Sequence, residues 1–251
     1  MDKMFPTEVI RLPSYGKFYP EEHPLRKNGG RLEIKYMTAK EEDILTNTNL
    51  LRNGKTLDKL IESLVVHDGV DYQDLSANDI TAILLFSRVI SYGKDYEIEL
   101  LCNHCNKQTT SVVDLTSLEA PDEGDVIEPN PDGTLTFNVP SGKSITIRVL
   151  TRKDEIEIDR QLEIADSKGL SMNIISSRLK RIVTSIDDIT DKTTISSMVE
   201  NLIVADTREI RSQYNRITPM VDIYVEVSCS HCGQMTGGQL PVSANFFWPD
   251  L

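Results

Sequence analysis

Two stretches of the chain show the same order of hydrophobic patterns. In GGRLEIKYMTAKEEDI (29–44), every second residue is apolar from Leu32 to Tyr36, which is typical of a half-buried strand. In SGKSITIRVLTRKDEI (141–156), the same alternation runs from Ile145 to Val149. Each alternating segment is followed by T-x-x-E or T-x-x-D, a pattern that predicts a helix start with a capping box.

Helical periodicity follows each predicted strand. Apolar residues recur at the spacing of one helix face in 56–66 and 173–186, and a second helix is predicted in 76–91 and 195–214. Each stretch then closes with a strand, a cysteine pair and another strand. We therefore predict an α+β protein built as a tandem pseudo-repeat of strand, helix, helix, strand, knuckle and strand.

The segments outside the two stretches show neither period, and proline and acidic residues concentrate between them. We accordingly divide the chain into an aromatic and proline-rich N-terminal arm (1–28), a first repeat with a cysteine knuckle (29–115), an acidic proline-rich linker (116–141), a second repeat with a knuckle (142–245) and an aromatic C-terminal tail (246–251).

Composition limits the class of partner. A chain of 251 residues can bury a core without disulfides. The 27 Lys and Arg against 39 Asp and Glu give a net charge of -12, which disfavours nucleic acid because phosphate binding depends on clustered cations. We find no signal peptide and no apolar run of 18 residues, so we expect no membrane partner.

The four cysteines occur as two short words, CNHC at 102–105 and CSHC at 229–232. A C-x-x-C turn brings two sulfurs to one point, and two such turns complete a tetrahedral structural zinc site. The gap between the words far exceeds that of a continuous zinc ribbon, but a duplication would explain it. We predict one zinc-ribbon-like site, shared between the halves and holding one zinc ion, with these ligands: Cys102, Cys105, Cys229 and Cys232.

Other interpretations of the cysteine words stay open. They could be redox pairs, although such pairs usually begin a helix; they could be unmetallated core residues or two separate sites; and His104 and His231 could serve as ligands. A catalytic zinc would need an open coordination position. The chain contains no H-E-x-x-H, P-loop, G-x-G-x-x-G or G-x-S-x-G motif, and His23 and His67 lie in no catalytic motif. We expect no enzymatic activity and no small-molecule substrate.

Aromatic residues concentrate in the arm and the tail. Because aromatics are enriched at the centres of protein interfaces, we predict that these segments bind a partner. In the alternative interpretation, they wrap back onto their own core. The candidate partner-binding residues are Tyr15, Phe18, Tyr19, Phe246, Phe247 and Trp248.

Several longer stretches resemble a known family. LPSYGKFYP, GGRLEIKYMTAKEEDILTNTNLLRNGKTLDKLI, SRVISYGKDYEIELLCNHC and the closing knuckle together resemble the baseplate hub and hub-assembly proteins of T-even-type contractile-tailed phages. The resemblance implies a viral, non-enzymatic protein made in the host cytoplasm that helps build the central hub of the tail baseplate and can remain in the virion. Its partners would be other hub and tail proteins. The family has no catalytic residues to transfer.

Two other classes of function compete with this one. A cytosolic zinc-ribbon adaptor for nucleic acid or the transcription machinery would need a basic face, which the net charge of -12 opposes. A C-x-x-C redox protein would need a thiolate with a low pKa and readily cycled pairs.

Overall fold

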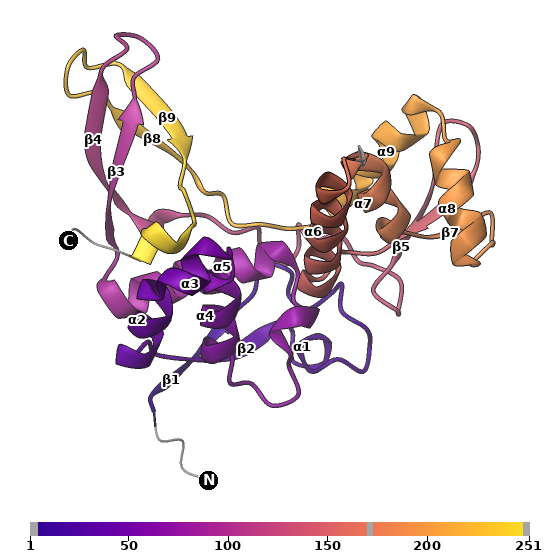
Figure 1. The fold of residues 1–251 in the computed structure, drawn as a ribbon, viewed down its shortest axis with the longest axis horizontal. Helices are drawn as coiled ribbons and strands as arrows, with labels where there is room; N and C mark the ends of the chain where they lie inside the picture. Colours follow the sequence, from indigo (N-terminus) through magenta and orange to yellow (C-terminus); the bar gives the residue numbers. More distant parts are fainter. Residues whose placement is uncertain (1–4, 170–172, 248–251) are drawn as a thin grey trace.

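The computed structural model describes residues 5–169 and 173–247, and it shows two lobes with a β ribbon that projects from the first of them (Figure 1). The first lobe contains β1 (Thr7–Arg11), α1 (Pro24–Lys27), β2 (Arg31–Lys35), α2 (Ala39–Thr46), α3 (Thr48–Arg52), α4 (Thr56–Leu64) and α5 (Ala77–Tyr92). The second lobe contains β5 (Leu135–Asn138), β6 (Ser144–Ile147), α6 (Arg152–Ser167), α7 (Ile174–Ile182), β7 (Val183–Ile186), α8 (Lys192–Glu200) and α9 (Val204–Arg216). The ribbon consists of β3 (Asp95–Leu101), β4 (Gln108–Asp114), β8 (Tyr224–Ser228) and β9 (Met235–Gln239).

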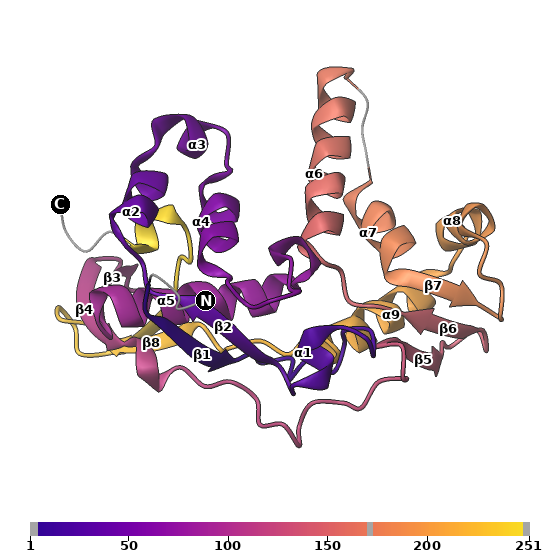
Figure 2. The same ribbon diagram turned by 90° about the horizontal axis from the view of Figure 1, so that it is seen from below.

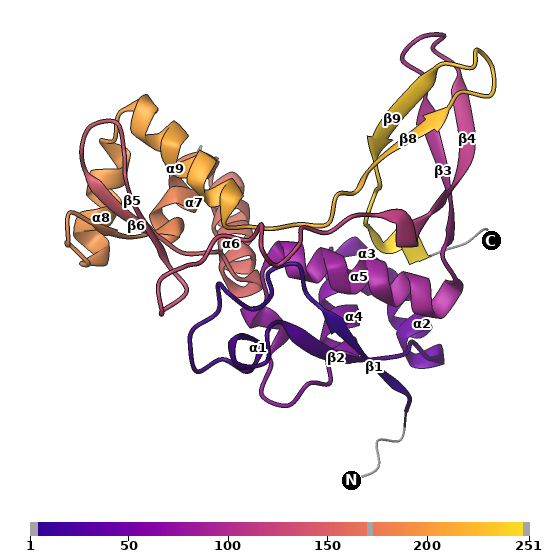
Figure 3. The ribbon, with the colours of Figure 1, turned by 180° about the vertical axis from the view of Figure 1, so that it is seen from behind.

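All strand pairs among the described residues are antiparallel, and the sheets are small. β1 pairs with β2, β3 with β4, and β8 with β9, whereas β5, β6 and β7 form a three-stranded sheet. The predicted α+β class is therefore confirmed. The chain crosses between the ribbon and the second lobe twice, through the linker after β4 (Figure 2) and through the segment from α9 to β8 (Figure 3).

Each lobe has its own apolar core. The first core packs α4 and α5 against β2, and it also takes in residues of the ribbon and of the C-terminal segment, among them Val225 and Leu240. The second core is built around β6 and α9, with Ile145, Ile147 and Ile210 completely or almost completely buried. Side chains of the ribbon thus belong to the first core, which fixes the ribbon to the first lobe.

The two predicted capping boxes start α2 and α6, so these predictions are confirmed. At the second box, the Thr151 N–H donates to the Asp154 carboxylate at 3.0 Å, and the Asp154 N–H donates to the Thr151 hydroxyl at 3.4 Å. At the first box, Glu41 accepts from both the N–H and the hydroxyl of Thr38. Glu41 also pairs with Lys35 at 2.7 Å in a fully buried position.

Two strands lie in the arm and in the linker, for which the sequence patterns predicted neither helix nor strand. β1 lies within 1–28 and β5 within 116–141. Each of them turns through a Pro-Ser step before pairing with the next strand, and each serine N–H donates to a buried aspartate at the start of a helix. Ser14 donates to Asp79 of α5 at 3.2 Å, and Ser141 donates to Asp206 of α9 at 3.0 Å.

Several polar contacts join the lobes, and the Asn78 side chain of α5 donates to the Thr218 carbonyl at 2.7 Å. Arg152 at the start of α6 forms a two-pronged ion pair with Asp58 of α4, at 2.6 and 2.9 Å. The Arg152 N–H also donates to the Leu75 carbonyl at 2.8 Å, next to a β-bridge between Ser76 and Thr151. No helix among the described residues has the length and apolar character needed to cross a bilayer.

Candidate metal centre

The four cysteines lie in the two hairpin loops of the ribbon, between β3 and β4 and between β8 and β9. Both loops use the same backbone bonds. In the first loop, the Cys102 N–H donates to the Lys107 carbonyl, and the Cys102 carbonyl accepts from the Asn106 N–H. In the second loop, the Cys229 N–H donates to the Gln234 carbonyl, and the Cys229 carbonyl accepts from the Gly233 N–H. All four distances are 2.9 Å.

One residue of each loop adopts the left-handed conformation, with φ of 55° at Asn106 and 72° at Gly233. Asn and Gly are the residues that adopt this conformation at least cost. The local sequence therefore shapes two matching turns, each of which presents two sulfurs on the same side.

The loops bring all four sulfurs into one cluster. The Sγ atoms of Cys102 and Cys232 are 3.7 Å apart, those of Cys105 and Cys229 are 3.8 Å apart, and all four lie within 4.8 Å of one another. A zinc ion with Zn–S bonds of about 2.3 Å would need sulfurs about 3.8 Å apart, whereas a disulfide would need about 2.05 Å. The cysteines are free thiols, so their geometry fits a tetrahedral metal ion.

Backbone donors point at two of the sulfurs. The His104 N–H donates to Cys102 Sγ and the His231 N–H to Cys229 Sγ, both at 3.4 Å. These bonds stabilise thiolates, and the His231 N–H lowers the pKa of Cys229 to about 6. At Cys232 a bond from the Gln234 N–H favours the thiolate, but burial and the neighbouring cysteines outweigh it and raise the pKa to about 12. A divalent cation at the centre of the four sulfurs would favour the thiolate there and remove the repulsion between thiolates.

Two threonines hold the hairpins together behind the sulfurs, and the sequence patterns did not identify them. The Ser230 N–H donates to the Thr109 hydroxyl at 3.0 Å, and the Asn103 N–H donates to the Thr236 hydroxyl at 3.5 Å. Both threonines are buried. The available signal was their position, since each is the fourth residue after the second cysteine of its word.

The structure also bears on the alternative ligands and on redox chemistry. The rings of His104 and His231 are exposed, and among the described residues the group able to hold a metal consists of the four cysteines alone. Neither C-x-x-C word begins a helix, because each leads into a strand, β4 or β9. A helix N-terminus of the kind that activates redox cysteines is therefore missing at both words.

The aromatic residues of the N-terminal arm pack on their own chain. Tyr19 is buried in the first core, whereas Phe18 is half-buried against the second. Tyr15 is also half-buried, and its hydroxyl donates to the Pro121 carbonyl in the linker at 3.0 Å. The partner-binding role of these residues stays a prediction, and their contacts here are those of the alternative in which the arm wraps back.

The C-terminal aromatics show the same preference. Phe246 and Phe247 are fully buried, with ring centroids 5.7 Å apart, and Phe246 lies 4.9 Å from Tyr96. The Phe246 carbonyl accepts from the buried guanidinium of Arg88 at 3.2 Å. Trp248 lies outside the described residues. Partner binding by this segment likewise stays a prediction.

Comparison with known proteins gives a family match. The family model described as "T4 bacteriophage base plate protein" matches residues 4–248. No curated protein and no solved structure matches the chain.

Proposed function

Because the chain belongs to the T4 bacteriophage base plate protein family, we propose that it is a structural or assembly protein of the central hub of a phage tail baseplate. It acts through contacts with other tail proteins rather than through catalysis. The family match over residues 4–248 carries this proposal. The hub assignment is supported by the motifs LPSYGKFYP and MTAKEEDIL, which resemble those of hub and hub-assembly proteins. The protein is made in the host cytoplasm and enters the particle during assembly.

The four-cysteine cluster of the ribbon binds one structural zinc ion. The observation that supports this is the approach of four free sulfurs to within 4.8 Å from loops far apart in the sequence. Cys102, Cys105, Cys229 and Cys232 supply the ligands. The metal clasps the two hairpins, because each of them contributes only half of a tetrahedral site.

The chain consists of two related halves, each ending in one hairpin of the ribbon. The matching cysteine turns support this, as do the paired bonds from Ser14 to Asp79 and from Ser141 to Asp206. β1 and β5 occupy equivalent places before these serines, so the halves begin at these strands. The ribbon then ties the ends of both halves to the first lobe.

Metal content tests the zinc site. We expect inductively coupled plasma mass spectrometry to find about one equivalent of zinc in the purified protein. The Cys229→Ser variant should contain no zinc. The matched control is Ser228→Ala at the adjacent exposed position, which keeps the zinc. If Cys229→Ser instead retained half of a two-equivalent content, the site would not be shared between the hairpins.

Phage assembly tests the baseplate role. In cells infected with phage that lack this gene, we expect the baseplate hub to be missing or incomplete, and a plasmid copy of the gene to restore it. Electron microscopy of the particles and identification of bound proteins give the readout. Normal baseplates and infectivity without the gene would refute the proposal.

A further inference from the structure

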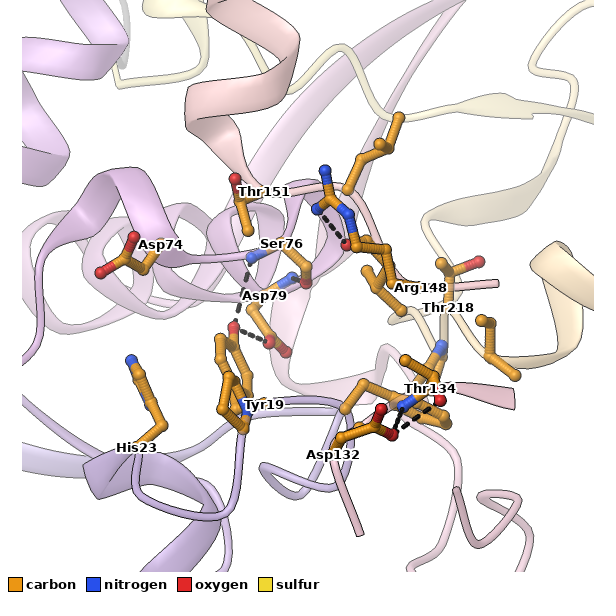
Figure 4. Close-up of a pocket in the computed structure, with 17 residues that line it drawn as sticks. Tyr19, His23, Asp74, Ser76, Asp79, Asp132, Thr134, Arg148, Thr151 and Thr218 are labelled. Carbon is orange, nitrogen blue, oxygen red and sulfur yellow. Dashed lines mark hydrogen bonds between the residues drawn. The ribbon is translucent and has the colours of Figure 1, made fainter. Parts of the chain in front are cut away.

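A cavity of about 320 Å³ lies where the two lobes meet. Figure 4 shows His23 and Tyr19 from the arm on one side of it, and Arg148 and Thr218 from the second lobe on the other. Its apolar walls are formed by Phe18, Pro20, Val149, Leu150, Ile217 and Pro219. A cavity of this size with mostly apolar walls is at the lower end of the range in which proteins bind ligands.

His23 lines this cavity and carries a hydrogen-bond donor that its own chain leaves unpaired. Its Nδ1 accepts from the Leu25 N–H at 3.2 Å and so caps α1. The proton of the neutral ring must then be on Nε2. The ring is fixed by stacking on Tyr19, with centroids 4.7 Å apart and planes 21° apart.

The donor on Nε2 is enclosed and has no hydrogen-bond partner among the described residues. Burial lowers the pKa of His23 and so favours the neutral ring. An enclosed N–H without an acceptor is unfavourable. A small rotation of the ring towards the cavity would expose Nε2 to an acceptor bound there, which would complete this bond.

The charges around the cavity are predominantly negative. Asp74 and Asp132 line it, and neither forms an ion pair among the described residues. Arg148 also lines it, but its guanidinium is held by Asp154 through bonds of 2.7 and 2.8 Å. Deeper in the wall, the carboxylate of Asp79 accepts from the Tyr19 hydroxyl at 2.6 Å. The rim therefore favours a cationic group on whatever enters.

We propose that the cavity binds an extended peptide segment of a neighbouring baseplate protein. An apolar side chain of the segment lies between the lobes, a backbone carbonyl accepts from His23 Nε2, and a Lys or Arg side chain lies beside Asp74 or Asp132. This rests on the proposed baseplate role. Phe18 and Tyr19 of the arm line the cavity, so the segment would contact two of the aromatic residues predicted to bind a partner.

A capped dipeptide serves as the probe. We would titrate N-acetyl-Leu-Lys-amide into protein labelled at its histidines and follow the ring signals by NMR, with N-acetyl-Leu-Glu-amide in parallel. We expect a saturable shift of the His23 ring and at least about fivefold weaker binding of the Glu peptide, because the rim is acidic. Equal affinity for both peptides, or no shift at His23, would overturn the proposal.

His23→Asn is the decisive variant. Asn keeps the side-chain acceptor that caps α1, but its amide N–H₂ ends short of the position of His23 Nε2, so no donor remains at that position. We expect the Lys peptide to bind about fivefold more weakly while the melting temperature stays close to that of the wild type. His67→Asn, outside the cavity lining, is the control and should bind normally. If His23→Asn bound the peptide as tightly as the control, the assigned donor would be wrong.

Incorporation into baseplates separates this inference from the proposed function. If the protein enters baseplates but does not bind the peptide, only the cavity assignment fails. If it binds the peptide but phage lacking its gene assemble normally, the baseplate role fails.

Discussion

Substitution of Phe246 tests whether the C-terminal segment stabilises the fold or binds a partner. Its side chain is fully buried, its ring packs 4.9 Å from that of Tyr96, and its carbonyl accepts from Arg88. Phe246→Ala would remove a completely buried aromatic ring, which typically lowers the free energy of unfolding by about 3–5 kcal/mol. Because a whole domain is stable by only about 5–15 kcal/mol, we expect a large loss of stability.

The loss should appear in the first lobe. For a chain of this size, 1 kcal/mol corresponds to about 2–4 °C, so Phe246→Ala should lower the melting temperature by roughly 6–20 °C. Differential scanning calorimetry is the suitable assay, since the two apolar cores can melt as separate transitions. Phe246 belongs to the first core, so the transition of the second core should move little.

An exposed position on the ribbon provides the control. Val112 is 63% exposed, so Val112→Ala should change the stability by no more than about 0.5 kcal/mol. If Phe246→Ala melted like the wild type but failed to enter baseplates, the burial argument would be wrong and the segment would act in docking.

Three further changes test other parts of the structure. Gly133→Ala should destabilise the protein by at least about 1 kcal/mol more than Gly142→Ala in a urea titration. Both glycines have positive φ, but only at Gly133 would a Cβ lie 2.8 Å from a backbone carbonyl oxygen. Equal losses of stability in the two variants would contradict this. Hydrogen bonds to the buried carboxylate of Glu41 outweigh the effect of its burial and lower its pKa from 4.5 to about 2. Its contribution is therefore fully present above about pH 4.5 and is lost as the pH falls towards 2, so the stability of Glu41→Gln should fall less steeply over this range, and parallel pH profiles would refute the assignment. Asp58→Asn should weaken the contact with Arg152 between the lobes and cost about 1 kcal/mol, and an unchanged urea midpoint would show that this ion pair does not stabilise the lobes.

The helix starts of α2 and α6 were predictable because their signals are local. Thr38 and Thr151 each cap a helix through a residue three positions later, and such a bond depends on the adjacent sequence alone. The two cysteine turns are local in the same sense. Four cysteines in two equal words also predicted that the loops would meet, because a tetrahedral ion needs all of them.

β1 and β5 could not be recognised in the same way. Of the five residues of β1, only Ile10 is buried, and β5 has no buried residue, so neither strand shows a full alternating pattern. Each is a strand because a neighbour, β2 or β6, supplies its hydrogen bonds. The hydrophobic pattern of an exposed edge strand does not show that another strand will pair with it.

The sequence by itself determined the mixed α+β class, the capped helices and the approach of the two C-x-x-C loops to each other. The first two depend on short-range spacing, and the third depends on the four ligands that a tetrahedral metal site needs. Only the tertiary structure decided the fate of the aromatic ends and of His23. A Phe at a chain terminus favours burial and an interface equally, because both remove apolar surface from water. At Phe246 the first core supplies the burial, whereas His23 is left beside a cavity with a donor that its own chain does not satisfy.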